Sequence, residues 1–242
     1  MRGQLLVRAT PEKRPAKRIS RKAALRVPDA HVHRGVVVWS AGRSASQLDV
    51  WFHPALGTHT SRRLVLVGHS MAGIIASRTA NRLQRPPALV IGVEANLTRA
   101  DAYFTGLAAQ FDEPAAFYAE FRARILRMSR RDAVVHPFAC SLEFADPVTL
   151  WTLGRSVFAQ KDPGAAFRRL RGPKIHYWDI AGASQDTRDY VARHELPIRT
   201  LPHLGHWPMV KAPSEFYVAI ATDIRRALGF DGTNSRKSRI HG

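Results

Sequence analysis

The chain has 242 residues, 45% of them hydrophobic, which suits one α/β domain with a sizeable core and leaves little room for a second. No apolar run approaches the roughly 20 residues that span a membrane, and residues 1–27 lack the apolar segment of a secretory signal. The single cysteine, Cys140, excludes an internal disulfide and suits a reducing compartment. We therefore expect a cytoplasmic protein with no membrane span.

The formal net charge of +18 is concentrated at the two ends of the chain. Residues 1–35 hold ten Lys or Arg residues against two acidic ones, and residues 225–242 hold five against one. We expect a basic, disordered arm over 1–35, an α/β domain over 36–228 and a basic tail over 229–242. Basic clusters attract phosphates without sequence preference, but the arm has no aromatic residue to stack on bases. No specific nucleic-acid partner is expected.

Short apolar strands alternate with helices through the middle of the chain. The expected strands cover 35–40, 64–67, 88–93, 174–181 and 196–202. One helix is expected over about 71–83, and a final amphipathic helix runs from Pro213 to just before Gly229. Residues 97–172 are rich in Ala, Phe, Arg and Leu at helical spacing, which predicts an inserted helical cap. The alternation predicts an α/β fold with a mostly parallel sheet flanked by helices.

The stretch "LVLVGHSMAG" (64–73) places Ser70 between small residues where a strand meets a helix. Such a bend lifts the hydroxyl above the sheet edge, and it needs small neighbours because the two backbones approach closely. It also directs the first N–H groups of the helix, above all that of Met71, at an oxygen that becomes negative during acyl transfer. Ala72 replaces the second glycine of the G-x-S-x-G pattern, which is a mild departure. A structural turn with an incidental serine is the alternative.

A serine hydroxyl is a poor nucleophile without a base, and "LPHLGHWPMVKAP" offers two histidines. His206 is favoured because it follows Gly205 in the loop between the last strand and the last helix. His203 lies closer to the end of the strand and lacks a preceding glycine.

The third member of a triad would be a carboxylate that holds the imidazole in the correct tautomer. Asp186 is favoured by its position, four residues beyond Gly182 and after the fourth strand. Glu94 is the main alternative because it also lies at the carboxyl end of a strand. Asp179 is expected inside the fourth strand and Asp189 on the following helix.

The chain order Ser70, Asp186, His206 is that of the α/β hydrolases. Residues from about 35 to 228 resemble this superfamily, with "GHSMAG" as the nucleophile elbow and "GHWPMVKAPSEF" as the histidine loop and last helix. The resemblance implies an esterase-like serine hydrolase. Its substrate would be a small-molecule carboxylic ester or related acyl compound, cleaved through an acyl-enzyme intermediate.

The N-terminal third departs from the family pattern. If "VVVWSAGRSAS" is the strand before the elbow, the strand carrying the second oxyanion donor belongs within residues 1–35, where none is found. Placing that donor at "WSAG" (39–42) instead removes a strand and a helix from the sheet. The alternative function is therefore a catalytically impaired α/β-hydrolase-like protein with an incomplete oxyanion hole.

No cofactor and no metal are expected. The segments "HVH" (31–33) and "HLGH" (203–206) lack a carboxylate or cysteine at ligand spacing. Neither a G-x-G-x-x-G sequence nor a P-loop is present, so no nucleotide cofactor is implied.

Overall fold

The computed structural model describes residues 64–229 and the backbone of one earlier strand, Val36–Trp39. The expected basic arm, the basic tail beyond Gly229 and most of the "WSAG" loop lie outside the described residues. Within the described part of the chain, no helix is both long enough and apolar enough to cross a bilayer.

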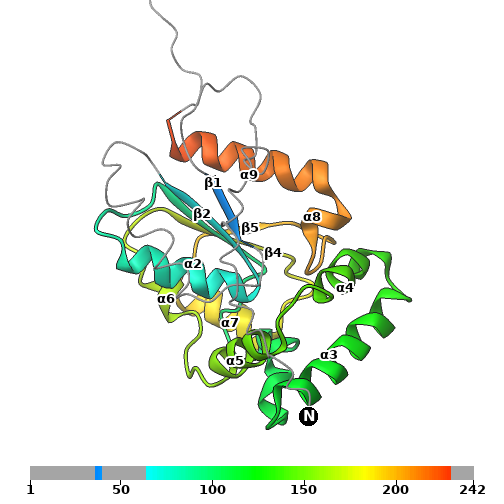
Figure 1. The fold of residues 1–242 in the computed structure, drawn as a ribbon. Helices are drawn as coiled ribbons and strands as arrows, with labels where there is room; N and C mark the ends of the chain where they lie inside the picture. The colour runs from blue at the N-terminus through cyan, green and yellow to red at the C-terminus, as the bar shows by residue number, and fades with distance from the viewer. Residues whose placement is uncertain (1–35, 40–63, 230–242) are drawn as a thin grey trace, which may run out of the picture.

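A five-stranded parallel sheet forms the centre of the fold, with its strands in the order β1-β2-β3-β4-β5 (Figure 1). The strands are β1 (Val36–Trp39), β2 (Val65–His69), β3 (Leu89–Val93), β4 (Lys174–Trp178) and β5 (Ile198–Thr200). The register pairs Gly68 of β2 with Gly92 of β3, and Gly92 with His176 of β4. This arrangement confirms the α/β fold that the alternation of elements predicts. Because all the strands are parallel, the loops that follow them meet at one edge of the sheet.

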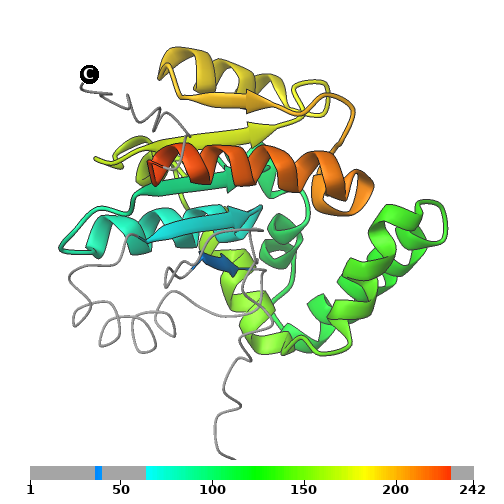
Figure 2. The same ribbon diagram turned by 90° about the horizontal axis from the view of Figure 1, so that it is seen from above.

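Helices lie on both faces of the sheet, with α9 on one side and α2, α6 and α7 on the other (Figures 1 and 2). The helices and 3-10 turns are α2 (Met71–Arg82), η2 (Ala100–Ala102), η3 (Thr105–Gln110), α3 (Pro114–Ser129), η4 (Ala133–Val135), α4 (His136–Leu142), α5 (Pro147–Phe158), α6 (Ala165–Arg168), α7 (Gln185–Arg193), α8 (Pro208–Lys211) and α9 (Pro213–Ala227). Both α2 and α9 match the helices that the sequence predicts to within one or two residues.

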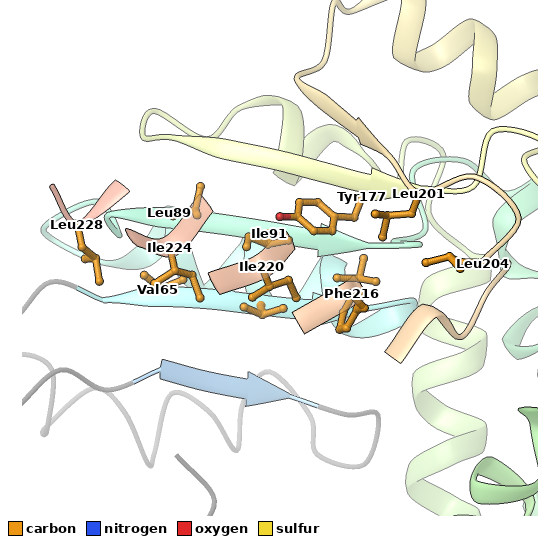
Figure 3. Close-up of a cluster of buried hydrophobic side chains, with 12 residues drawn as sticks. Val65, Leu89, Ile91, Tyr177, Leu201, Leu204, Phe216, Ile220, Ile224 and Leu228 are labelled. Atoms are coloured by element: carbon orange, nitrogen blue, oxygen red, sulfur yellow. The ribbon is translucent and has the colours of Figure 1, made fainter. Parts of the chain in front are cut away.

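Alternate strand residues contribute to two separate cores, as the period of two in a strand requires. The core beneath α9 is shown in Figure 3 and contains Val65, Val67, Leu89, Ile91, Val93, Tyr177, Leu201, Leu204, Phe216, Ile220, Ile224 and Leu228. The opposite core includes Leu66, Val90, Phe167, Trp178, Tyr190 and Val191. Since β2 and β3 are covered on both faces, "VLV" of β2 and "LVIGV" of β3 are continuous runs without a charged residue.

The chain between β3 and β4 is helical, as the sequence predicts, and α3 and α4 extend away from the sheet (Figures 1 and 2). This segment has a core of its own, in which Phe117, Phe121 and Ile125 of α3 are fully buried. Trp207, from the loop after β5, packs against the same cluster. The helical segment therefore contacts the loop that carries His206.

A buried carboxylate joins the last helix to the sheet. Asp223 of α9 is 2% exposed and accepts hydrogen bonds from Arg199 of β5, at 2.7 Å from Nε and 2.5 Å from Nη2. The hydroxyl of Tyr177, in β4, donates to the same carboxylate. Burying a charge is costly unless it is paired and hydrogen-bonded. The Asp223 carboxylate meets both conditions, because Arg199 pairs with it and both Arg199 and Tyr177 donate hydrogen bonds to it.

We expect Asp223→Ala to lower the free energy of unfolding by about 2–4 kcal/mol, because Arg199 and Tyr177 lose their shared acceptor. The value lies near the low end for a buried pair since 35% of the Arg199 side chain is exposed. Urea unfolding measures the loss. The control is Glu120→Ala, which breaks an exposed pair with Arg127 and should cost less than about 1 kcal/mol. Equal losses in the two variants would contradict the role given to Asp223.

Candidate active site

Ser70 lies at the sharp bend between β2 and α2, in a backbone conformation that favours glycine. Its φ is +54° and its ψ −128°, so a non-glycine residue is held in a strained region. The bend is fixed from both sides: the Ser70 N–H donates to the carbonyl of Val93 at 2.9 Å, and its own carbonyl accepts from Gly73 N–H at 2.9 Å. The structure thus has the strand–turn–helix geometry that the sequence predicts around this serine.

Close approach of the backbones explains the small residues around Ser70. A Cβ on Gly68 would lie 2.4 Å from the carbonyl oxygen of Ala72, which is backbone and cannot move aside. A Cβ on Gly73 would lie 2.3 Å from the Cβ of Ala95, in the loop after β3. Ala72 is completely buried, so the position of the second glycine in the G-x-S-x-G pattern accepts alanine in this fold.

His206 lies in the loop between β5 and α8, at the same edge of the sheet. Its side chain is 12% exposed and is surrounded by aromatic rings. The ring centroids of Trp207, Tyr103 and Phe104 lie 5.0, 5.4 and 5.7 Å from that of His206. His203, the rival histidine, has an exposed position with φ +64°.

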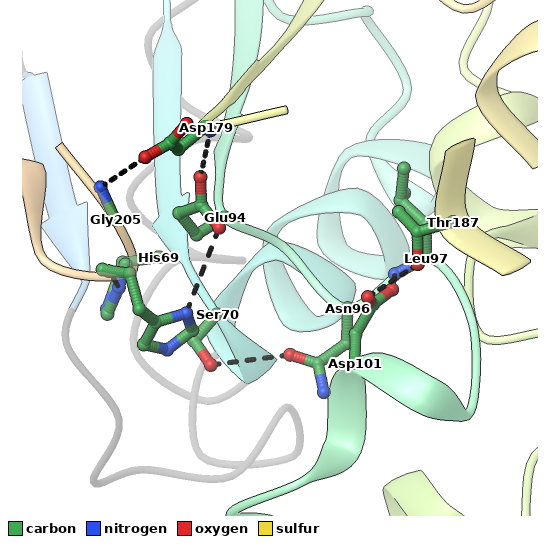
Figure 4. Close-up of polar contacts among 10 residues, drawn as sticks. His69, Ser70, Glu94, Asn96, Leu97, Asp101, Asp179, Thr187 and Gly205 are labelled. Atoms are coloured by element: carbon green, nitrogen blue, oxygen red, sulfur yellow. Dashed lines mark hydrogen bonds and ion pairs between the residues drawn. The ribbon is translucent and has the colours of Figure 1, made fainter. Parts of the chain in front are cut away.

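The carboxylate nearest to His206 in the described structure belongs to Glu94, which directly follows β3. Glu94 Oε2 lies 4.0 Å from His206 Nδ1, within the range of an ion pair but beyond that of a hydrogen bond. Its other oxygen, Oε1, accepts a hydrogen bond of 2.5 Å from the backbone N–H of Asp179 (Figure 4). Glu94 has φ +45° and donates its own N–H to the carbonyl of Tyr177 at 2.8 Å. Two strands therefore hold this carboxylate in place.

The structure does not bring Asp186 to His206. The side chain of Ser184 caps α7 by accepting from Thr187 N–H, so Asp186 lies in the first turn of the helix, where it is exposed. No hydrogen bond or ion pair joins Asp186 to His206 among the described residues. Asp189 is also exposed on α7, as expected for a residue of that helix.

Asp179 was expected inside the fourth strand, but β4 ends at Trp178, so Asp179 lies at the carboxyl edge. Its side chain is buried, and Oδ2 accepts a hydrogen bond of 2.9 Å from the backbone N–H of Gly205. Asp179 thus connects the end of β4 to the residue before His206, while its own N–H orients Glu94. Figure 4 shows both contacts, from Gly205 to Asp179 and from Asp179 to Glu94.

Burial governs the charges of the Glu94–His206 pair. Desolvation raises the pKa of Glu94; the hydrogen bond from the Asp179 N–H opposes it, the carboxylates of Asp179 and Asp101 add smaller increases, and the resulting pKa is about 8. Desolvation, with a smaller contribution from the nearby ring of His69, lowers the pKa of His206 to about 3. Both groups are therefore uncharged near neutral pH in the structure described, with the proton on Glu94.

The Ser70 hydroxyl donates to the side chain of Asn96 rather than to His206. The distance from Ser70 Oγ to Asn96 Oδ1 is 3.3 Å, and Asn96 is 2% exposed. The loop carrying Asn96 is ordered by Asp101, whose Oδ2 accepts from the N–H groups of Leu97 and Thr98. Neither Asn96 nor its contact with the serine is predicted from the sequence, because no motif marks it.

Met71 is the first residue of α2 and is 1% exposed. Its N–H therefore belongs to the first turn of the helix, directly after Ser70. That is the position expected for an oxyanion donor. The sequence leaves two places for the second donor, residues 1–35 and "WSAG" (39–42), and of these the structure describes only the backbone of Trp39. No group of three or more His, Cys, Asp or Glu residues in the described part of the chain could hold a metal ion.

The buried Glu94 also predicts how stability depends on pH. Its pKa is about 8 in the folded protein against 4.5 ordinarily, so the stability it contributes is full below pH 4.5 and is lost as the pH rises to 8. Each unit corresponds to about 1.4 kcal/mol, so the wild type should lose about 2 kcal/mol relative to Glu94→Gln between pH 6.5 and 8.5. Urea unfolding across this range tests it, with the exposed Glu120→Gln as control. Parallel curves for wild type and Glu94→Gln would contradict the prediction.

Solved structures with a similar fold include several hydrolases. An esterase from Thermogutta terrifontis is 19% identical with a TM-score of 0.53, the match covering 82% of this chain and 76% of that one. E-2-(acetamidomethylene)succinate hydrolase is 16% identical with a TM-score of 0.53, covering 76% and 74%. AqDC, described in recognition and ring cleavage of the Pseudomonas quinolone signal, is 19% identical with a TM-score of 0.55, covering 79% and 76%. At these identities the likeness concerns the fold.

No curated protein matches this chain significantly. The family model described as the alpha/beta hydrolase family matches residues 18–220, which is most of the chain. The match includes the elbow, the carboxyl edge of the sheet and the histidine loop, and the chain belongs to the alpha/beta hydrolase family.

Proposed function

We propose that this protein is a serine-dependent hydrolase that cleaves a carboxylic ester or related small acyl substrate through an acyl-enzyme intermediate. The observation that carries the proposal is the convergence of three residues at one sheet edge: the strained Ser70, the largely buried His206, and Glu94, 4.0 Å from His206 Nδ1. Membership of the hydrolase family and the esterase among the similar structures support the same reaction class.

In this mechanism the Ser70 oxygen attacks the acyl carbon while its proton passes to Nε2 of His206. The negative charge on the acyl oxygen is stabilised by the Met71 N–H at the start of α2. The leaving alcohol then takes the proton from His206 as its bond to the acyl carbon breaks. Water repeats the two steps on the acyl-enzyme, and the acid and free Ser70 are released.

We assign the orienting carboxylate to Glu94 rather than to Asp186. Glu94 faces Nδ1 of His206, the nitrogen that must donate a proton toward the acid, whereas Asp186 is exposed on α7. An ionised Glu94 would accept from Nδ1–H and stabilise the imidazolium. A protonated Glu94 would donate to Nδ1 instead, which places the ring proton on Nε2 and blocks the base. Activity therefore requires Glu94 to lose its proton.

A catalytically impaired α/β-hydrolase-like protein is the second candidate. The observation that favours it is the hydrogen bond of Ser70 to Asn96, together with a Glu94–His206 separation too long for a hydrogen bond. If the protein is an active hydrolase, rotation about the Cα–Cβ bond of Ser70 moves the hydroxyl from Asn96 toward His206 when substrate binds. The two candidates differ in whether Ser70 is reactive.

A fluorophosphonate probe tests this difference directly. We expect the purified full-length chain to be labelled once per molecule, because the probe reacts with an activated serine, and Ser70→Ala to lose the label entirely. His206→Ala should lower the labelling rate by at least about 10³-fold. Cooperative unfolding of each protein shows that it is folded. A folded wild type that stays unlabelled would favour the impaired protein.

The pH profile of labelling distinguishes the two carboxylates. The wild-type rate should rise with pH to a plateau above about pH 8, since the burial-raised pKa of Glu94 controls the base. Glu94→Gln should lower the plateau by about 10²–10⁴-fold and remove this rise, as expected when the group orienting the base is lost. The matched control, Asp186→Asn, should leave rate and profile unchanged. The opposite result, loss in Asp186→Asn alone, would return the role of the acid to Asp186.

A further inference from the structure

His69, the residue immediately before the nucleophile, makes a direct contact with the histidine loop. Its Nε2 lies 2.6 Å from the backbone carbonyl oxygen of His206, a short distance for an N–H···O hydrogen bond. The two imidazole rings lie with centroids 4.8 Å apart and tilted by 54°. Because His69 directly precedes Ser70, this contact connects the strand end that carries Ser70 to the loop that carries His206.

We infer that His69 is a positioning residue: its Nε2–H holds the backbone of His206 so that the imidazole stays aligned with Ser70. The inference rests on the proposed hydrolase function and deepens it. No part of the nucleophile-elbow pattern calls for this contact, since the pattern leaves the position before the serine open.

The loop itself explains why such a contact is needed. Residues 201–207 contain no helix or strand, and Gly205 has φ +62°. From the β4 side, the loop is held by the hydrogen bond of Gly205 N–H to Asp179. From the β2 side, it is held by His69 through the carbonyl of His206. Together these two bonds fix the backbone on both sides of the Cα of His206. A misplacement of 1 Å at a reacting group costs about 10²-fold in rate.

The chemistry of histidine suits this position. A carbonyl can only accept, so Nε2 of His69 must carry the proton, which fixes the tautomer. Burial lowers the pKa of His69, although its hydrogen bond to the His206 carbonyl acts in the opposite direction. A neutral ring supplies the donor without placing a positive charge beside His206. Such a charge would oppose formation of the imidazolium.

A donor role and a space-filling role predict different substitutions. Glutamine at position 69 keeps an N–H on a side chain of similar reach, whereas methionine fills the space and has no such donor. If the hydrogen bond matters, His69→Gln should restore what His69→Met loses. If only volume matters, the two variants should behave alike. His194 provides the control. It follows the last residue of α7, and its ring packs on Tyr190 of the same helix rather than on the histidine loop.

The experiment measures the second-order rate of fluorophosphonate labelling in full-length His69→Met, His69→Gln, His194→Met and His194→Gln, each checked for cooperative unfolding. We expect His69→Met to be slower than wild type by about 10–100-fold and His69→Gln to be within about 5-fold of wild type. The His194 variants should label as wild type does. Equal slowing of both His69 variants, or no slowing in either, would overturn the inference. His69→Leu replaces His69→Met if the latter does not fold.

A second readout does not depend on activity. In protein carrying ¹⁵N-labelled histidine, the ring signals of His206 should shift in His69→Met and stay close to wild type in His69→Gln. Unchanged His206 signals in both variants would overturn the inference even if labelling fails. A wild type that is folded but unlabelled removes the proposed hydrolase function, and the ring signals then decide whether His69 holds the loop.

Discussion

The parallel pairing of β2, β3 and β4 is the constraint on which the site depends. Pairing in register brings the carboxyl ends of these strands together, so that Ser70 and Glu94 follow neighbouring strands at the same level and Asp179 follows the third strand one residue further along. The backbone of one strand then holds the next: Ser70 N–H bonds to Val93, and Glu94 N–H bonds to Tyr177. The site is thus a continuation of the sheet's own hydrogen bonding beyond the last regular residues, with side chains added to it.

This origin makes the polar edge rigid in its strands and adjustable in its loops. The glutamate and the serine take positive φ angles that the strand ends impose, whereas His206 depends on side-chain contacts from Asp179 and His69 to hold its loop. The aromatic residues around His206 come largely from the helical segment between β3 and β4 and exclude water from the pair. Exclusion of water strengthens interactions between charges that develop during reaction, but it also raises the cost of a resting ion pair.

Much of the fold could be predicted from the sequence, because the spacing of apolar residues marks the strands and helices and because proline and glycine mark where several of them begin or end. The strand before Ser70, the helix after it and the final helix from Pro213 all form as the pattern indicates. The helical character of the segment after β3 follows in the same way. The limits of β4 were harder to predict, since "DIAG" continues an apolar pattern although the strand ends at Trp178.

Which carboxylate lies near His206 could not be predicted from the sequence because chain order does not give distance. Asp186 and Glu94 both follow a strand, and only the sheet order shows that β3 adjoins β2, the strand before Ser70, while β4 lies one place further. The cap formed by Ser184 carries Asp186 into a helix and away from the edge. The contacts of Asn96 with Ser70 and of His69 with His206 left no signal either, since each joins segments that are distant in the sequence.

The contact between Gly73 and Ala95 has an evolutionary consequence. A Cβ at position 73 would lie 2.3 Å from the methyl group of Ala95, so helix α2 and the loop after Glu94 touch with no spare volume. A substitution that enlarges either residue would push apart the two segments whose spacing sets the geometry of the site. Substitution at the two positions is therefore coupled: a methyl group gained at 73 requires the loss of the methyl group at 95, and even then it lies 3.3 Å from the Cα of residue 95. Homologous sequences that keep this packing should show the pair changing together, a signature readable in an alignment without any structure.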